Sequence, residues 1–95
     1  MSEQVTTRDN AEAGRFEVLV GDEVAGYAVY TVSDGVATMP HTVVEKAFDG
    51  QGLGGKLARF SLDTVRSRGL RLDPVCPFIK GYVDKHEEYA DLLVG

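Results

Sequence analysis

The spacing of apolar side chains along this chain first has a period of two and later a period of three to four. Residues 15–20, 24–32 and 36–44 alternate or are rich in β-branched and aromatic side chains, which predicts three strands. The stretches 21–23 and 33–35 are turns, and the second contains the Asp-Gly pair typical of a tight hairpin. We therefore expect an antiparallel three-stranded meander whose middle strand, apolar on both faces, lies inside the sheet.

From about Gly52 to Arg68 the apolar spacing becomes helical. One stripe of this helix is expected to face the sheet, and it consists of Leu53, Leu57, Ala58, Ser61, Leu62 and Val65. A short strand follows at 70–75, and a second helix is predicted over 77–85, with Pro77 at its first position. Residues 87–95 form a short terminal helix or coil. The order β-β-β-loop-α-β-α predicts an α+β fold with helices packed against an antiparallel sheet.

Two polar or irregular stretches complete this pattern. Residues 1–14 lack a period, so we expect a flexible lead-in before a single compact domain at 15–95. Pro40 cannot donate a hydrogen bond within a sheet, so it predicts an edge or a bulge in the third strand.

Composition indicates the cellular environment and the possible partners of the protein, but not its function. The chain has 95 residues and a net charge of −5, which argues against nucleic acid or an anionic membrane as its main partner. Cys76 is the only cysteine, so a reducing environment fits. No apolar run approaches the ~20 residues that span a bilayer, and the polar residues 2–4 do not begin a signal peptide. We expect a cytoplasmic protein, a monomer or weak dimer, without membrane or nucleic-acid partners.

Four glycines between residues 50 and 55 lead directly into the first predicted helix. Glycine adopts positive φ and lets a ligand approach without meeting a Cβ. The start of a helix carries unpaired N–H groups and the positive end of the helix dipole. This combination predicts a binding site for a phosphate or pyrophosphate group. The alternative is a glycine-rich helix entry without a ligand.

Two familiar phosphate-binding motifs fit this loop only in part. Gly50, Gly52 and Gly55 match the dinucleotide motif G-x-G-x-x-G, but residues 45–49 separate them from the strand and the upstream strands form hairpins. In the P-loop pattern, Leu57 stands where a hydroxyl group should bind Mg²⁺. A third pattern is a loop that holds the pyrophosphate of an acyl-CoA.

On this third pattern the sequence resembles the small, single-domain branch of the GCN5-related N-acetyltransferase superfamily. Gly52 and Gly54 occupy the two glycine positions of its [RQ]-x-x-G-x-[GA] signature, and Asp49 stands at the leading position. Similarity extends to residues 41–44 before the loop and to residues 76–79 after it. It continues through Tyr82, His86, Glu88 and Tyr89.

The resemblance implies the acyl-CoA N-acyltransferase fold, with acetyl-CoA as acyl donor and no metal. In the superfamily the strand before the loop splays from its neighbour, and the pantetheine arm pairs with the freed backbone groups. The cofactor-binding residues that this implies are Thr42, Val43, Val44, Gln51, Gly52, Leu53, Gly54, Gly55, Lys56, Phe78 and Ile79.

The implied reaction is acyl transfer from a thioester to an amine, which needs a base, an oxyanion donor and an acid for the leaving thiolate. Tyr82 is the candidate acid, because many superfamily members use a tyrosine on the corresponding helix; alternatively it is a core or stacking aromatic. His41 suits a base, or it is a hydrogen-bonded strand-end residue. Cys76 is a candidate nucleophile at a helix start, but we favour a small buried residue.

His41 and Cys76 lie at the ends of predicted strands that flank the loop and helix, so we expect them to converge at one site. Together with His86 they lack the paired spacing of metal ligands, so no metal site is predicted.

The leading hypothesis is an acetyl-CoA-dependent N-acetyltransferase acting on an unknown amine. The alternative is a non-catalytic CoA-binding or protein-interaction module of the same fold. Larger superfamily members place helices between their first two strands to build the acceptor pocket, whereas only residues 21–23 connect the first two strands predicted here. The acceptor would then be exposed, supplied by a partner, or large, such as a protein lysine.

Overall fold

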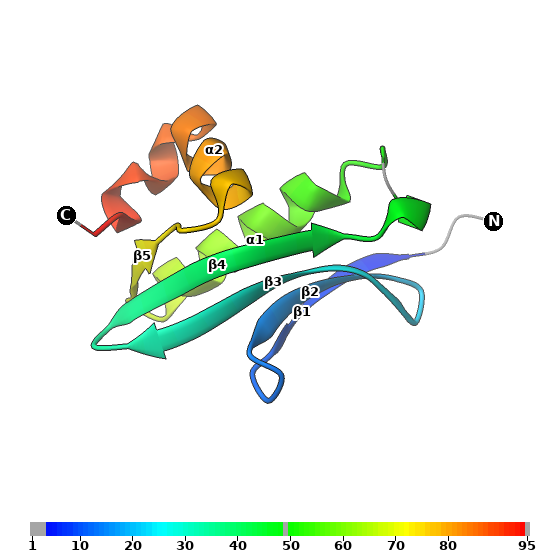
Figure 1. The fold of residues 1–95 in the computed structure, drawn as a ribbon, viewed down its shortest axis with the longest axis horizontal. Coiled ribbons are helices and arrows are strands. Elements are labelled where there is room, and N and C mark those ends of the chain that lie inside the picture. The colour runs from blue at the N-terminus through cyan, green and yellow to red at the C-terminus, as the bar shows by residue number, and fades with distance from the viewer. Residues whose placement is uncertain (1–3, 49, 95) are drawn as a thin grey trace.

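The computed structural model describes residues 4–48 and 50–94 and consists of one sheet with α1 and α2 on one face (Figure 1). The five strands lie in sequence order: β1 (Val5–Asn10), β2 (Arg15–Val20), β3 (Glu23–Ser33), β4 (Val36–Val44) and β5 (Arg71–Asp73). Strands β1 to β4 are antiparallel, whereas β5 is parallel to β4. The helices are α1 (Leu53–Ser67) and α2 (Pro77–Lys85), with short 3₁₀ helices η1 (Lys46–Phe48) and η2 (Glu87–Leu92).

The expected meander is confirmed as β2, β3 and β4, with β3 between its two neighbours. In the turn between β3 and β4, Asp34 and Gly35 have φ angles of 53° and 77°. Two successive left-handed residues are what a type I′ hairpin turn requires, and the Asp-Gly pair tolerates them.

The prediction of a flexible lead-in is wrong for residues 5–10, which form the edge strand β1. This strand pairs with β2 from Val5 opposite Val20 to Asn10 opposite Arg15. The segment shows no apolar period because it lies at the edge of the sheet, where its ordering depends on polar contacts with β2. The connection between the first two strands is therefore the turn at residues 11–14, and the turn after Val20 is the second one.

Helix α1 buries the stripe that the sequence predicts. Its buried residues are Leu53, Leu57, Ala58, Ser61, Leu62 and Val65, and they share one core with Phe16, Val18 and Ala28 of the sheet. The Ser61 hydroxyl donates to the carbonyl of Leu57 at 2.7 Å, so this buried polar group is satisfied. Within the described residues, no helix is long and apolar enough to cross a membrane.

Strand β4 has neighbours on both sides only at its beginning. Strand β5 pairs with residues 36–38, and the Cys76 N–H then donates to the carbonyl of Met39 at 2.8 Å. The pairing with β3 shifts register between Thr38 and His41, where β4 has one residue more than β3. This confirms the expected irregularity at Pro40. Among the described residues, 41–44 have a sheet neighbour only on the β3 side.

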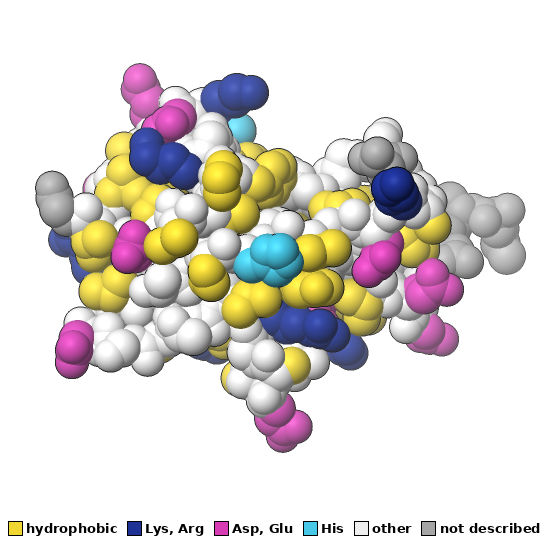
Figure 2. Space-filling view, viewed as in Figure 1, with side chains coloured by type: hydrophobic (Ala, Val, Ile, Leu, Met, Phe, Trp, Pro, Cys, Tyr) yellow, Lys and Arg dark blue, Asp and Glu magenta, His cyan; other side chains and the backbone are white. Residues whose placement is uncertain are grey.

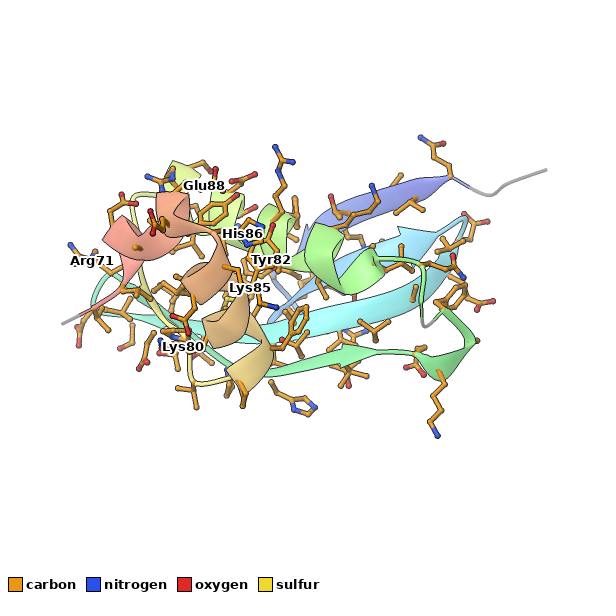
Figure 3. The ribbon with its side chains drawn as sticks, turned by 90° about the horizontal axis from the view of Figure 1, so that it is seen from above. Arg71, Lys80, Tyr82, Lys85, His86 and Glu88 are labelled. Atoms are coloured by element: carbon orange, nitrogen blue, oxygen red, sulfur yellow. The ribbon has the colours of Figure 1, made fainter. Side chains whose placement is uncertain are left out.

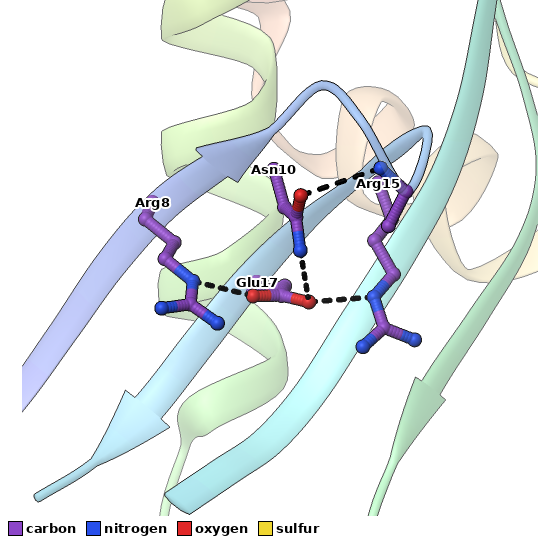
Figure 4. A network of polar contacts seen from close by, with 5 residues as sticks. Arg8, Asn10, Arg15 and Glu17 are labelled. Carbon is purple, nitrogen blue, oxygen red and sulfur yellow. Dashed lines mark hydrogen bonds and ion pairs between the residues drawn. The ribbon is translucent and has the colours of Figure 1, made fainter. Parts of the chain in front are cut away.

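Glu17 is a buried carboxylate on the sheet face that points away from α1 (Figure 4). It accepts hydrogen bonds from Nε of Arg8 at 2.5 Å, Nε of Arg15 at 2.6 Å and Nδ2 of Asn10 at 3.2 Å. Burial alone would raise the pKa of Glu17, but these bonds outweigh burial and hold the pKa below its usual value. The network joins β1 to β2.

We expect Glu17→Gln to lower the free energy of unfolding by about 1–3 kcal/mol, because an amide bonds two guanidinium groups less strongly than a carboxylate. Since folding lowers the pKa of Glu17, its contribution is complete above the unfolded-state pKa and is lost as pH falls through the folded-state pKa. Urea unfolding at neutral and acidic pH should show the gap between wild type and variant narrowing in acid. A gap independent of pH would contradict this role.

Candidate active site

Among the described residues, the N-cap position of α1 supplies no side-chain hydrogen bond to the backbone N–H groups of the first turn. Gly52 is the N-cap residue, with left-handed φ of 72° and ψ of 16°, and Gly50 has φ of 81°. The first N–H groups of a helix lack partners within the helix, so this end can hold an anionic group. Asp49, at the leading position of the superfamily signature, lies outside the described residues.

Gly54 is the point where α1 meets the start of α2. A Cβ at Gly54 would lie 3.0 Å from Cζ of Phe78, so the missing side chain lets this ring pack against the first turn of α1. Phe78 is nevertheless 44% exposed. A Cβ at Gly55 would meet nothing within 4 Å, so this second glycine faces open space.

The unpaired part of β4 offers backbone groups to an extended ligand. The Glu45 N–H donates to the carbonyl of Ala25 on β3 at 2.7 Å. Backbone groups alternate in direction along a strand, so Val43 also points toward β3, whereas Thr42 and Val44 point toward the open edge. A ligand arm can hydrogen-bond to these groups as an added strand would.

Cys76 lies where β4 and β5 separate, at the N-cap position of α2. The thiol is buried and donates to Oγ1 of Thr42, with the two atoms 3.3 Å apart. Burial alone would raise the pKa of Cys76. Hydrogen bonds that the thiolate accepts from the Thr42 hydroxyl and from backbone N–H groups of Ile79 and Phe78 outweigh burial and lower the pKa. The sequence analysis missed the contact with Thr42, because it depends on the register between β4 and β5.

His41 does not join Cys76, contrary to the expectation that the two converge. Successive strand residues point to opposite faces, so the contact of Thr42 with Cys76 places His41 on the other face of the sheet. There its exposed ring lies 6.5 Å from the ring of Tyr27, measured between centroids. Figure 2 shows a histidine over β4 among hydrophobic side chains, with basic side chains beside it. The bulge at Pro40 causes the discrepancy, because one extra residue exchanges the faces of all later residues.

Tyr82 lies on the side of α2 that faces α1 (Figure 3). Its ring stacks on His86 with centroids 3.9 Å apart, and together with Phe78 and Lys85 it lines a hollow of about 270 Å³. Burial raises the pKa of Tyr82, so the hydroxyl keeps its proton at neutral pH. It can therefore donate a proton or a hydrogen bond.

Other predicted ligand residues differ in what they can offer. The side chains of Leu53 and Ile79 are buried in the core at 2% and 0% exposure, so only their backbone groups could meet a ligand. Gln51 is exposed before α1. Lys56 lines a separate hollow of about 360 Å³ between β1 and α1. Among residues 4–48 and 50–94, no group of three or more His, Cys, Asp or Glu side chains is placed to hold a metal ion.

A mixed sheet, antiparallel except for β5, that opens beside a glycine-rich helix start defines the acyl-CoA N-acyltransferase class of α+β fold. The family model described as GCN5-related N-acetyl-transferase matches residues 15–92. The chain belongs to this family.

Solved structures show the same fold. A GCN5-like protein from Staphylococcus aureus is 22% identical with a TM-score of 0.69, and the match covers 99% of this chain and 90% of that one. The ribosomal-protein-S18-alanine N-acetyltransferase from Escherichia coli is 27% identical with a TM-score of 0.58, over 61% of this chain and 38% of the enzyme. A GNAT-family protein from Desulfovibrio desulfuricans is 22% identical with a TM-score of 0.54, over 78% and 52% of the two chains. This chain therefore spans well under two thirds of the length of the last two proteins. No curated protein sequence matches it.

We expect the pKa of Cys76 to lie below that of an exposed cysteine, and Thr42→Val to raise it, because the thiolate loses a hydrogen bond. The ¹³Cβ shift of Cys76 in a pH titration reads the ionisation without a reagent, and Thr42→Ser is the matched control. Since folding lowers this pKa, Cys76 contributes stability above the unfolded-state pKa and loses it as pH falls through the folded-state pKa. The same titration midpoint in Thr42→Val and wild type would refute the role of the hydroxyl.

Proposed function

We propose that this chain transfers an acetyl group from acetyl-CoA to an amine. The observation that carries the proposal is the convergence of three elements. Cys76, at the start of α2, contacts Thr42 on the open part of β4, and two residues further on Phe78 packs against Gly54 at the start of α1. An open strand edge and a helix start with glycine at its N-cap thus lie on either side of one short segment.

The chemistry of the residues present fits acetyl-CoA. The N–H groups at the start of α1 suit a pyrophosphate, and the backbone groups of Thr42 and Val44 suit the amides of a pantetheine arm. Phe78 and Tyr82 offer apolar surface for the thioester end. Bound there, acetyl-CoA supplies an activated acyl group.

The chain's own groups would then serve three roles in the transfer. His41 takes the proton of the acceptor amine, directly or through water, which frees the nitrogen to attack. A backbone N–H on the open edge of β4 donates to the carbonyl oxygen as it gains charge. Tyr82 gives its proton to the departing thiolate as the N–C bond forms and the C–S bond breaks, which leaves an imidazolium on His41 and a phenolate on Tyr82 until both exchange protons with water. Direct transfer leaves Cys76 as a polarised residue beside the site rather than a nucleophile.

We expect Gly54→Asp to abolish CoA binding, because the side chain adds charge and bulk where the pyrophosphate is proposed to lie. An aspartate in the first turn of a helix is favourable by about 0.3–1 kcal/mol, and the Phe78 ring that it displaces is partly exposed, so the variant should fold. Calorimetric titration with CoA tests this, and Ser33→Asp adds the same charge at an exposed position on the far end of β3. Wild-type affinity in a folded Gly54→Asp would refute the loop assignment.

We expect Cys76→Ala to keep activity within about tenfold of wild type and Tyr82→Phe to lose about a hundredfold or more, as for a lost general acid. Thiol release from acetyl-CoA with an amine panel measures turnover, and CoA titration shows that both variants still bind. Complete loss in Cys76→Ala with intact binding would indicate an acyl-cysteine route. Binding of acetyl-CoA without turnover on any amine would favour the non-catalytic module.

A further inference from the structure

The face of the sheet that carries His41 also carries a rigid pair of guanidinium groups. Residues directly opposite one another on neighbouring strands share a face, which places Arg8, Arg15 and Tyr27 on this side. None of the described helices covers it, because α1 packs on the face that carries Phe16 and Val18.

Glu17 holds both guanidinium groups in place and leaves their outer ends free. Arg8 and Arg15 each use only Nε to reach the carboxylate, so both terminal nitrogens of each group have no partner among the described residues (Figure 4). The guanidinium of Arg15 also lies 4.5 Å from the centre of the Tyr27 ring, which fixes its orientation further. The side chains of Arg8 and Arg15 are 54% and 33% exposed, whereas that of Glu17 is 0% exposed.

The charge balance of this cluster is positive. A single arginine would neutralise Glu17, and the second leaves one unit of positive charge on an otherwise acidic chain. Two preordered guanidinium groups with free terminal N–H donors form the arrangement that binds carboxylate and phosphate oxygens. Ordering these side chains in advance reduces the entropy that a ligand must overcome.

We propose that Arg8 and Arg15 form an anion clamp for the acceptor, and that the acceptor is a peptide with an anionic side chain near its reactive amine. This inference depends on the proposed acetyl transfer in one respect, which is the position of the reactive amine beside His41. Strands β4 and β2 are two strand spacings apart, which is about 10 Å from His41 to Arg15. An extended peptide covers that distance in about three residues. The clamp therefore selects a carboxylate or phosphate about three or four residues from the amine.

The test is a titration of the ¹⁵N-labelled full chain, with CoA present, by peptides that carry one lysine and, three residues away, glutamate, phosphoserine or glutamine. We expect the glutamate and phosphoserine peptides to shift the Nε resonances of Arg8 and Arg15. We expect them to bind about fivefold or more tightly than the glutamine peptide, and the preference to fade at high salt. The phosphoserine and glutamate arms distinguish the two sources of negative charge.

Variants separate the clamp from general electrostatics. Arg8→Gln should remove most of the preference and Arg8→Lys should keep part of it, with CoA affinity unchanged in both. Lys80→Gln removes the same charge from the exposed side of α2 and should leave the preference intact. Equal affinity for the glutamate and glutamine peptides, or a preference that survives in Arg8→Gln, would overturn the clamp.

The two proposals fail in different ways. Acidic-peptide binding at Arg8 and Arg15 in a chain that does not bind CoA would refute the transferase and leave the clamp standing. Turnover with acetyl-CoA but no preference for acidic peptides would refute the clamp and leave the transferase standing.

Discussion

The arrangement of the candidate site depends on the unequal length of two neighbouring strands. Strand β4 has 9 residues, whereas its parallel neighbour β5 has 3. Pro74 cannot donate a ladder bond and Pro77 suits the first turn of a helix, so the chain between them leaves the sheet at Cys76. Within the described part of the chain, the second half of β4 has an unpaired edge, which costs free energy unless water, a ligand or a partner pairs with it.

Local features, two of them prolines, explain why much of this fold could be predicted from the sequence. Helix α2 begins at Pro77 as expected, and the apolar stripe of α1 is the one that the helical period indicates. Pro40 correctly marked an irregularity in β4. In each case a local property, either a missing N–H or a side-chain period, decides the outcome without help from distant residues.

The errors arise where distant residues decide. Strand β1 is polar and has no period, and it is ordered because Arg8 and Asn10 bond to a carboxylate on β2. The face that His41 occupies depends on which residue of β4 is doubled in the bulge, and a proline indicates a bulge without indicating its register. The contact of Cys76 with Thr42 likewise requires the pairing of β4 with β5. The side-chain pattern of one strand does not by itself give the register in which that strand pairs with its neighbours.

The net charge of the chain does not predict the local charge on the sheet face opposite the helices, because that charge also depends on contacts between distant residues. The net charge of the chain is −5. Glu17 nevertheless forms ion pairs with two arginines, so the local net charge there is positive. Average charge governs long-range attraction and repulsion, whereas recognition at contact distance depends on which side chains the fold brings together.

The separation of His41 from Cys76 is consistent with transfer between two reactants that approach from opposite faces. Thr42, Cys76 and Tyr82 lie on the helix side of β4, and His41 lies on the uncovered side.

In the proposed reaction the thioester occupies the helix side and the amine arrives across the outer face. Between the described residues of β4 and α2, the open edge of β4 offers a passage from one face to the other, because β5 pairs only with residues 36–38. His41 would then accept the amine proton on the acceptor side, and Tyr82 would protonate the thiolate on the donor side. The short β5 is what makes such a passage possible.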